Sequence, residues 1–173
     1  MICSKDELLE RKEGENYSDY FERLHEWFSK NILNKLTING LPLMVREFPP
    51  EGMKYEEAFY HLTCTDYEKQ TKYRYPDFHR SKRLPLLKAI VKNYDNCPTC
   101  IDLNICGGIL IWKKLNEKNN YFRYHLFFPE DDYLIVIEKR KKYYLLITGF
   151  YVKPLKKEEY FNEYDLYKVD TIS

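Results

Sequence analysis

The side chains in this sequence best suited to chemistry are its histidines and a run of basic residues. A histidine titrates near neutral pH, so it can accept or donate a proton during a reaction. Of the four histidines, His61 lies in an aromatic segment, which is equally compatible with a structural place in the core. His79 lies beside the basic run, His125 falls in an expected strand, and His25 is expected to be structural.

Basic residues are concentrated in one part of the chain. Residues 69–92 include eight basic residues and one acidic residue, a local balance of +7, whereas the net charge of the whole chain is +1. Within this run, Arg80, Lys82 and Arg83 lie beside the expected start of a helix. A helix N-terminus attracts anions through its free N–H groups, and a guanidinium matches the shape of a phosphate. The pattern therefore predicts a phosphate site; a surface ion pair between one arginine and Asp77 is the alternative.

A hydroxyl and a phenol near the end of the chain are further candidates. Thr148 follows the apolar run 143–147, and a hydroxyl at a strand end can bind phosphate, although threonine is also common in strands for its shape alone. Tyr151 can donate to phosphate or stack on a base, but it is one of 17 tyrosines. Aromatic side chains beside cations are typical of surfaces that bind single-stranded RNA.

Five cysteines raise the alternative of a metal site. Cys97 and Cys100 have C-x2-C spacing, Cys106 follows six residues later, and Cys64 can supply a fourth thiolate. Four sulfurs would form a closed structural zinc site, not a catalytic one. Because a second C-x2-C pair is missing, free thiols in a loop with a buried Cys64 are the other interpretation. Apart from this structural zinc, we expect no cofactor.

Two features bear on where the chain works. No stretch approaches the roughly 18 apolar residues that cross a membrane, so no membrane partner is expected. Residues 1–14 are charged and lack the apolar core of a signal peptide. We therefore expect a cytoplasmic protein, whose cysteines are mostly thiols.

The first half of the chain is predicted to begin with a helix. Residues 17–36 carry apolar side chains at helical spacing, and Ser18 is a candidate cap. Asn39-Gly40 is a turn signal that ends this element. Residues 41–48 are predicted to form a short edge strand, because Pro42 has no N–H to donate to a neighbouring strand.

The middle of the chain is predicted to hold a second helix. Residues 55–64 are a short ordered segment whose type the sequence leaves open, and residues 67–76 are expected to be a basic surface loop. Residues 84–94 form the predicted helix. If Ser81 is its N-cap, Pro85 falls in the first turn, where the missing N–H costs little.

Four β-rich runs separated by short polar turns follow, and such turns favour antiparallel pairing. The runs are residues 108–112, 121–128, 133–138 and 143–152. Helices followed by strands predict an α+β fold with a four- to five-stranded antiparallel sheet. The length predicts one domain, 1–173, with residues 1–16 flexible and residues 153–173 forming a tail, in which 158–167 is a closing helix or irregular.

Several motifs, taken together, resemble a known family in their order and spacing. They are Leu-Thr-Ile-Asn-Gly at 36–40, Phe-Tyr-His-Leu at 59–62, Asp-Phe-His-Arg-Ser-Lys-Arg-Leu-Pro at 77–85, the segment 97–112, Asp-Tyr-Leu-Ile-Val-Ile-Glu-Lys-Arg at 132–140, and Tyr-Tyr-Leu-Leu-Ile-Thr-Gly-Phe-Tyr at 143–151. In this respect the core, 37–152, resembles the phage- and prophage-encoded branch of the barnase/EndoU/colicin/RelE-like nucleases, the BECR fold.

This resemblance implies a small antiparallel sheet with helices on one side and RNA bound across the open face. It implies RNA cleavage without metal, by attack of a ribose 2′-hydroxyl on the adjacent phosphate. His61 matches the family's histidine. The implied catalytic residues are His61, Arg83 and Thr148, and the implied substrate-binding residues are Arg80, Lys82, His79 and Tyr151.

One motif departs from the family pattern. The usual Thr-Ala-Tyr reads Thr148-Gly149-Phe150 here, so the family's tyrosine is absent unless Tyr151 takes its place. A phage toxin of this class would act on RNA in the cytoplasm of a bacterial host and would be restrained by a protein antidote. Two other functions stay open: a non-catalytic inhibitor or adaptor that binds a target protein, and a zinc-stapled RNA-binding module. Fold-level analogy does not decide among them.

Overall fold

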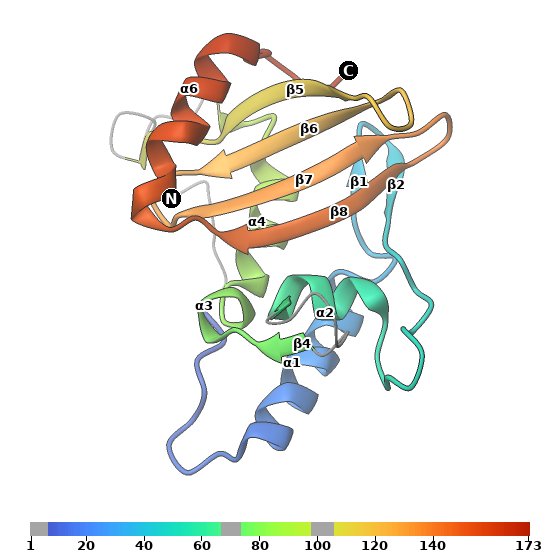
Figure 1. The fold of residues 1–173 in the computed structure, drawn as a ribbon, viewed down its shortest axis with the longest axis vertical. Coiled ribbons are helices and arrows are strands. Elements are labelled where there is room, and N and C mark those ends of the chain that lie inside the picture. The colour runs from blue at the N-terminus through green and yellow to red at the C-terminus, as the bar shows by residue number, and fades with distance from the viewer. Residues whose placement is uncertain (1–6, 67–73, 98–105) are drawn as a thin grey trace.

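The computed structural model describes residues 7–66, 74–97 and 106–173, and Figure 1 shows how their helices and strands are arranged. Helix α1 (Tyr17–Asn31) buries Tyr20, Leu24 and Phe28 along one side, as the sequence predicts.

The ends of α1 differ from the prediction. The N-cap is Asn16 rather than Ser18, because the Asn16 side chain accepts a hydrogen bond from the Asp19 N–H. The helix stops at Asn31 instead of residue 36, and Asn34 then adopts a left-handed backbone with φ 54°. Asparagine is one of the few residues that tolerate this conformation, so the sequence contained the stop signal.

A hairpin follows α1 at one edge of the sheet. Strands β1 (Thr37–Ile38) and β2 (Leu41–Met44) are joined by Asn39 and Gly40, whose φ angles are 50° and 75°. Two consecutive positive φ angles are typical of a type I′ hairpin turn, the turn for which Asn-Gly is favoured. The prediction of an edge strand is wrong: β2 lies between β1 and β8, and β1 is at the edge.

The main sheet has six strands within the described residues, in the order β1-β2-β8-β7-β6-β5. Four of them form the antiparallel meander that the sequence predicts: β5 (Leu110–Asn116), β6 (Tyr121–Phe128), β7 (Tyr133–Lys139) and β8 (Tyr144–Tyr151). The α+β class is therefore confirmed. The sheet as a whole is mixed, not antiparallel, because Leu43 and Met44 of β2 pair in parallel with the start of β8.

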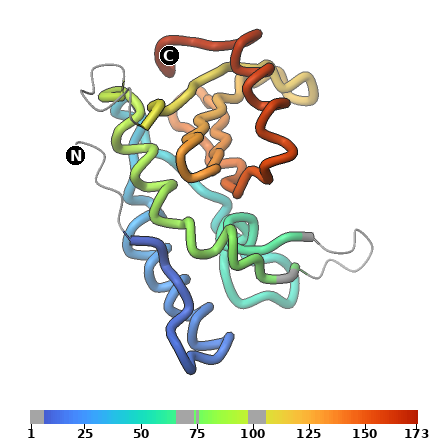
Figure 2. Tube along the Cα trace, turned by 90° about the vertical axis from the view of Figure 1, so that its left-hand side faces the viewer, coloured from blue at the N-terminus to red at the C-terminus, as the bar shows by residue number. Residues whose placement is uncertain are grey.

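Helices lie against both faces of the sheet, as Figure 2 shows from the side. On one face, α1 and α4 (Leu84–Asn93) build the larger core with residues such as Leu87 and Ile135. On the other face, Trp112 and Phe127 pack under Tyr160 of helix α6 (Lys157–Tyr167), which follows a short 3-10 turn (Pro154–Lys156). The second face is therefore not open where α6 lies, in contrast to the arrangement that the resemblance implies.

Four short elements lie below the sheet in Figure 1, and two of them, α2 and α3, contact β8. They are α2 (Glu57–Thr63), β3 (Cys64–Asp66), β4 (Arg74–Pro76) and α3 (Phe78–Ser81). The expected basic loop at 67–76 is thus partly a strand, and residues 67–73 lie outside the described residues.

The start of α4 is also different from the prediction. Ser81 is not its N-cap, because the Ser81 hydroxyl donates to the carbonyls of Thr63 and Asp77, at 3.0 and 2.7 Å. The helix begins after Arg83, and Pro85 lies in its first turn as predicted.

The segment before α1, for which the sequence suggests flexibility, makes specific contacts. The Leu9 N–H donates to the Lys82 carbonyl at 2.9 Å, and the Tyr20 hydroxyl donates to the Leu9 carbonyl at the same distance. These bonds attach the segment to α1 and to the link between α3 and α4.

Candidate functional site

A tight connection between α2 and β3 brings His61 close to Arg74. The last residue of α2, Thr63, donates its hydroxyl back to the Phe59 carbonyl at 2.7 Å, and the chain becomes extended at Cys64. Strand β3 then pairs antiparallel with β4, so that Arg74, 13 residues after His61, lies opposite the end of β3.

The Nε2 atom of His61 lies between an anion and a cation. It is 3.1 Å from Glu57 Oε1, one helical turn earlier, and 3.3 Å from Arg74 Nη2. A carboxylate only accepts hydrogen bonds and a guanidinium only donates them. A protonated Nε2 therefore binds Glu57, whereas an unprotonated Nε2 binds Arg74. The side chain is 29% exposed, so the imidazole ring is partly accessible from solvent.

The surroundings favour the neutral form of His61. Burial and the charge of Arg74 lower its pKa below the ordinary value, and Glu57 opposes this only in part. Burial alone would raise the pKa of Glu57, but the hydrogen bond with His61 and the charge of Arg46 outweigh burial, and the net shift is downward. At neutral pH the pair is thus an unprotonated imidazole beside a carboxylate, which is the state required of a base.

The two arginines predicted to bind phosphate both donate to backbone carbonyls. Arg80 Nη1 donates to the carbonyls of His61 and Cys64, at 2.9 and 2.8 Å. Arg83 donates to the Asp131 carbonyl from Nε at 3.2 Å and to the His79 carbonyl from Nη1 at 2.8 Å. Both side chains therefore have a structural role, and their phosphate role stays a prediction.

Two predicted substrate-binding residues, His79 and Tyr151, form a stack at the end of β8 with Arg83, which was predicted to be catalytic. The rings of His79 and Tyr151 have centroids 5.3 Å apart and an angle of 23° between their planes. The Arg83 guanidinium carbon lies 4.4 Å from the centre of the Tyr151 ring. His79 is exposed, and the Asp77 side chain caps α3 by accepting from the backbone N–H groups of His79 and Arg80.

Helix α2 approaches β8 closely because position 149 has no side chain. A Cβ at Gly149 would lie 2.7 Å from the Tyr133 hydroxyl and 3.0 Å from Leu62 Cδ2. The Tyr133 hydroxyl is buried and has no hydrogen-bond partner among the described residues. Burial raises the pKa of Tyr133 above its ordinary value, and the charges of Arg80 and Arg83 oppose that rise. Gly149 thus sets the distance between the helix that carries His61 and the sheet.

The remaining predicted site residues lie apart from His61. Thr148 pairs with Val136 and so lies on the face of the sheet that α6 covers, whereas Gly149 and Tyr151 pair with Ile135 and Tyr133, on the opposite face. Lys82 forms an ion pair with Glu10 at 2.8 Å.

The cysteines that the structure describes do not form a zinc site. Within residues 7–66, 74–97 and 106–173, no group of three His, Cys, Asp or Glu side chains could hold a metal ion. Cys64 and Cys97 are buried, and burial raises the pKa of Cys64 to about 11, so it is a thiol at neutral pH. Cys100 lies outside the described residues, so the complete four-cysteine set stays a prediction.

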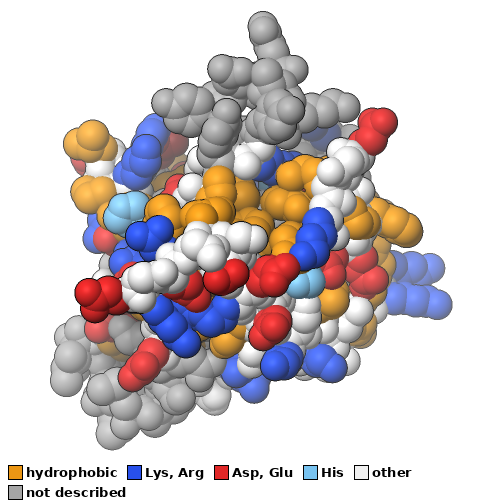
Figure 3. Space-filling model, turned by 90° about the horizontal axis from the view of Figure 1, so that it is seen from below, with side chains coloured by type: hydrophobic (Ala, Val, Ile, Leu, Met, Phe, Trp, Pro, Cys, Tyr) orange, Lys and Arg blue, Asp and Glu red, His pale blue; other side chains and the backbone are white. Residues whose placement is uncertain are grey.

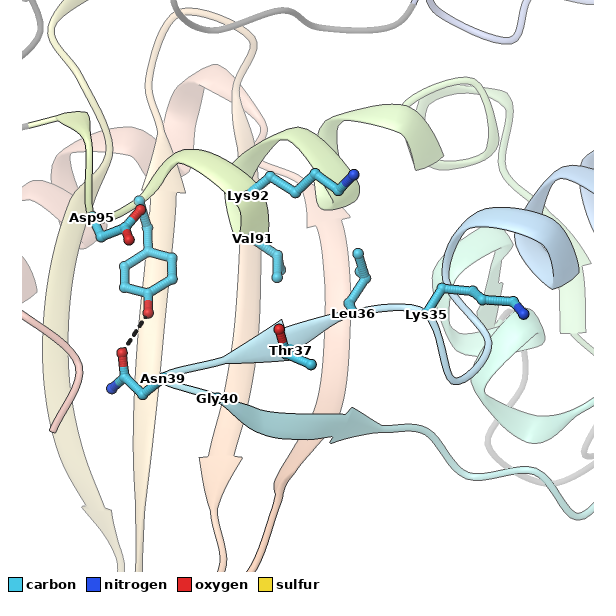
Figure 4. A pocket seen from close by; sticks show the side chains of 9 residues that line it. Lys35, Leu36, Thr37, Asn39, Gly40, Val91, Lys92 and Asp95 are labelled. Atoms are coloured by element: carbon cyan, nitrogen blue, oxygen red, sulfur yellow. Dashed lines mark hydrogen bonds between the residues drawn. The ribbon is translucent and has the colours of Figure 1, made fainter.

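Two other surface features are distinct from the site formed by His61, Glu57 and Arg74. An open cavity of about 370 Å³ lies between α4 and the β1–β2 hairpin, where the Tyr94 hydroxyl donates to Asn39 Oδ1 at 2.7 Å (Figure 4). Figure 3, seen from below, shows hydrophobic side chains gathered between charged ones. Elsewhere on α1, His25 lies against Tyr55, with ring centroids 4.2 Å apart, and its Nε2 is 2.8 Å from Glu56.

Two residues beside His61, Glu57 and Arg74, were not predicted as site residues. Glu57 is four residues before His61, a spacing at which side chains meet on a helix, so this signal was available. Arg74 was one basic residue among eight, and only the pairing of β3 with β4 distinguishes it from the others.

Comparison of the chain with models of protein families, with curated proteins and with solved structures finds no match. In the part of the chain that the structure describes, no helix is both long enough and apolar enough to cross a membrane.

Proposed function

We propose that this protein is a metal-independent endoribonuclease with His61 as the base. The observation that carries the proposal is the position of His61 Nε2 between Glu57 and Arg74, together with its lowered pKa. The antiparallel meander β5–β8 supports a barnase/EndoU/colicin/RelE-like fold, and the proposed origin in a phage or prophage rests on the sequence resemblance alone.

In the proposed reaction, His61 Nε2 takes the proton of a ribose 2′-hydroxyl, and the oxygen attacks the adjacent phosphorus. The bond from phosphorus to the 5′-oxygen breaks, and that oxygen receives a proton from an acid. His79 is our candidate for the acid, since Arg80, the next residue, is hydrogen-bonded to the backbone of His61. The products are a 2′,3′-cyclic phosphate and a free 5′-hydroxyl.

The role of Arg74 in this proposal follows from its contact with the base. When the phosphate binds, the Arg74 guanidinium is close enough to His61 to donate to a phosphate oxygen while His61 binds the neighbouring hydroxyl. A guanidinium that moves from imidazole to phosphate removes a positive charge from the base and favours its protonation during the reaction. The rings of Tyr151 and His79 provide an aromatic surface on which a nucleobase beside the scissile phosphate can stack.

The test is cleavage of total RNA and of a short single-stranded oligonucleotide by purified protein in excess chelator. We expect the wild type to cleave, and His61→Gln to be slower by about 10²- to 10⁴-fold, the usual contribution of a general base. His25→Gln is the matched control, because His25 also pairs with a glutamate and is similarly exposed. Circular dichroism establishes that each variant is folded.

Two results would contradict the proposal: intact RNA with the wild type, or equal rates for the wild type and His61→Gln. The rising limb of the pH–rate profile should lie below the ordinary histidine pKa, because the neutral form of His61 is the active base and its pKa is lowered.

A second function, binding of RNA or a protein without cleavage, is favoured by one observation. Arg80 and Arg83 both use donor groups on backbone carbonyls, an arrangement that builds a surface and leaves fewer donors for a reacting phosphate. RNA that stays intact but is retained by the protein would identify this function.

A further inference from the structure

A second part of the surface combines positive charge with exposed aromatic rings. We call it the basic hairpin surface and define it as residues 113–123 and 138–142, the two hairpin turns at one end of the sheet with the strand ends beside them. These segments contain eight basic residues and two acidic ones, a balance of +6, in a chain whose net charge is +1. The two turns lie side by side in Figure 1, at the end of β8 opposite to Tyr151.

The exposed aromatic rings of this surface each have a cation against them. Phe122 is 43% exposed, and the Lys113 ammonium nitrogen is 4.2 Å from the centre of its ring. Tyr121, the preceding residue of β6, points to the opposite face of the sheet; it is 38% exposed, and the Arg140 guanidinium carbon is 3.9 Å from its ring centre. Rings flanked by cations in this way attract the π-face of a base and the phosphate beside it.

A buried carboxylate holds the two turns together. Glu138 is fully buried and forms ion pairs with Arg123, at 2.9 Å, and with Arg140. It also accepts hydrogen bonds from the side chains of Asn116 and Asn119, at 3.3 and 3.1 Å. The Glu138 carboxylate is thus bound by neighbouring side chains inside the surface. The side chains of Lys118, Lys139, Lys141 and Lys142 are exposed on the outside.

We propose that the basic hairpin surface binds single-stranded RNA, with a base on Phe122 and phosphates on the surrounding lysines. Charge alone would suit any polyanion. The exposed rings favour a single strand, because the bases of a duplex are already stacked and its grooves present no free faces. The inference deepens the proposed function, on which it rests for the identity of the ligand, and makes this surface a docking site at the far end of the strands from His79 and Tyr151.

The experiment measures binding separately from cleavage. Binding of a fluorescent single-stranded oligouridine to His61→Gln protein is followed by anisotropy at several salt concentrations. We expect Phe122→Ala to weaken binding by about 5- to 100-fold at unchanged charge, the range for loss of one stacked base. The double variant Lys141→Gln/Lys142→Gln should weaken binding and reduce the slope of log affinity against log salt by about 1.4.

Matched controls come from other parts of the surface. Phe48→Ala removes a side chain that is 89% exposed on the loop before α2, and Lys30→Gln removes an exposed charge on α1; neither should change affinity. Equal affinity for a duplex of the same length, or for vesicles of phosphatidylserine, would overturn the proposal in favour of a general anion surface. Unchanged binding by Phe122→Ala would overturn it as well.

Failure of this proposal is distinguishable from failure of the proposed function. If the docking site is real and catalysis at His61 is not, the oligonucleotide binds and Phe122→Ala weakens binding, but RNA stays intact with the wild type. If catalysis is real and the docking site is not, RNA is cleaved, and Phe122→Ala leaves both binding and the KM for long RNA unchanged.

Discussion

The contact between Gly149 and Tyr133 allows a quantitative test of how α2 is placed on the sheet. The backbone at Gly149 is not left-handed, so alanine is sterically allowed there as far as the main chain is concerned. A glycine-to-alanine change at such a position normally stabilises a protein by about 0.4–1 kcal/mol, because the unfolded chain loses freedom. Here the added Cβ would lie 2.7 Å from the Tyr133 hydroxyl, 3.0 Å from Leu62 Cδ2 and 3.3 Å from Ile135 Cγ2.

All three neighbours of that Cβ are buried, so none can move into solvent. Overpacking of a core costs about 1–3 kcal/mol, which exceeds the gain from the unfolded state. We therefore expect Gly149→Ala to lower the free energy of unfolding by about 1–2 kcal/mol, and the melting temperature by roughly 2–8 °C for a chain of this size.

Tyr133→Phe removes the atom responsible for the shortest contact. It also removes a buried hydroxyl without a partner among the described residues, so by itself it should leave stability unchanged or raise it by about 1 kcal/mol. In the Tyr133→Phe background, Gly149→Ala should then cost at least about 1 kcal/mol less than in the wild type. Urea unfolding followed by circular dichroism gives all four values, and an equal cost in the two backgrounds would refute this account of the α2–β8 contact.

Three further predictions concern stability. Burial lowers the pKa of His125 to about 4, so the free energy of unfolding should fall by up to about 3 kcal/mol as the pH drops from 6.5 toward 4. His125→Phe keeps the stacking on Trp112 and should remove most of that fall between pH 7 and 5. Urea unfolding at each pH measures both values. Glu138→Gln should lower the free energy of unfolding in urea by about 2–3 kcal/mol, because two partly exposed arginines lose their buried partner. A decrease below about 1 kcal/mol would contradict the described network. Asp77→Ala should cost about 1 kcal/mol as the loss of a helix cap, whereas Asp77→Asn should retain most of the stability in a thermal melt.

Local sequence signals predicted the elements whose partners are close in the chain. The Asn39-Gly40 turn and the short turns between the strands from β5 to β8 specify antiparallel hairpins, because two strands joined by a few residues have little choice of partner. The burial of Tyr20, Leu24 and Phe28 likewise follows from spacing within a single helix.

Contacts between distant segments were not predictable in the same way. The parallel pairing of Leu43 with Tyr144 joins residues about 100 positions apart, and no local pattern distinguishes β8 from β5 as the neighbour of β2. The α6 helix follows the same rule: the sequence allowed a helix or a tail, and only the apolar face around Trp112 and Phe127 determines where it docks.

The basic residues of the chain have different partners in the structure, although the sequence suggested that one group of them forms a single site. The basic run between residues 69 and 92 predicted a single phosphate site, yet within it Arg80 and Arg83 bind backbone carbonyls and Lys82 pairs with Glu10. A guanidinium held by carbonyl oxygens keeps its charge, so it still attracts anions at long range, but it has fewer donors for direct contact. In the proposed function, direct contact with RNA falls to Arg74 beside His61 and to the exposed lysines of the basic hairpin surface. Removing Arg74 should therefore affect the chemical step, whereas removing those lysines should affect affinity and its dependence on salt.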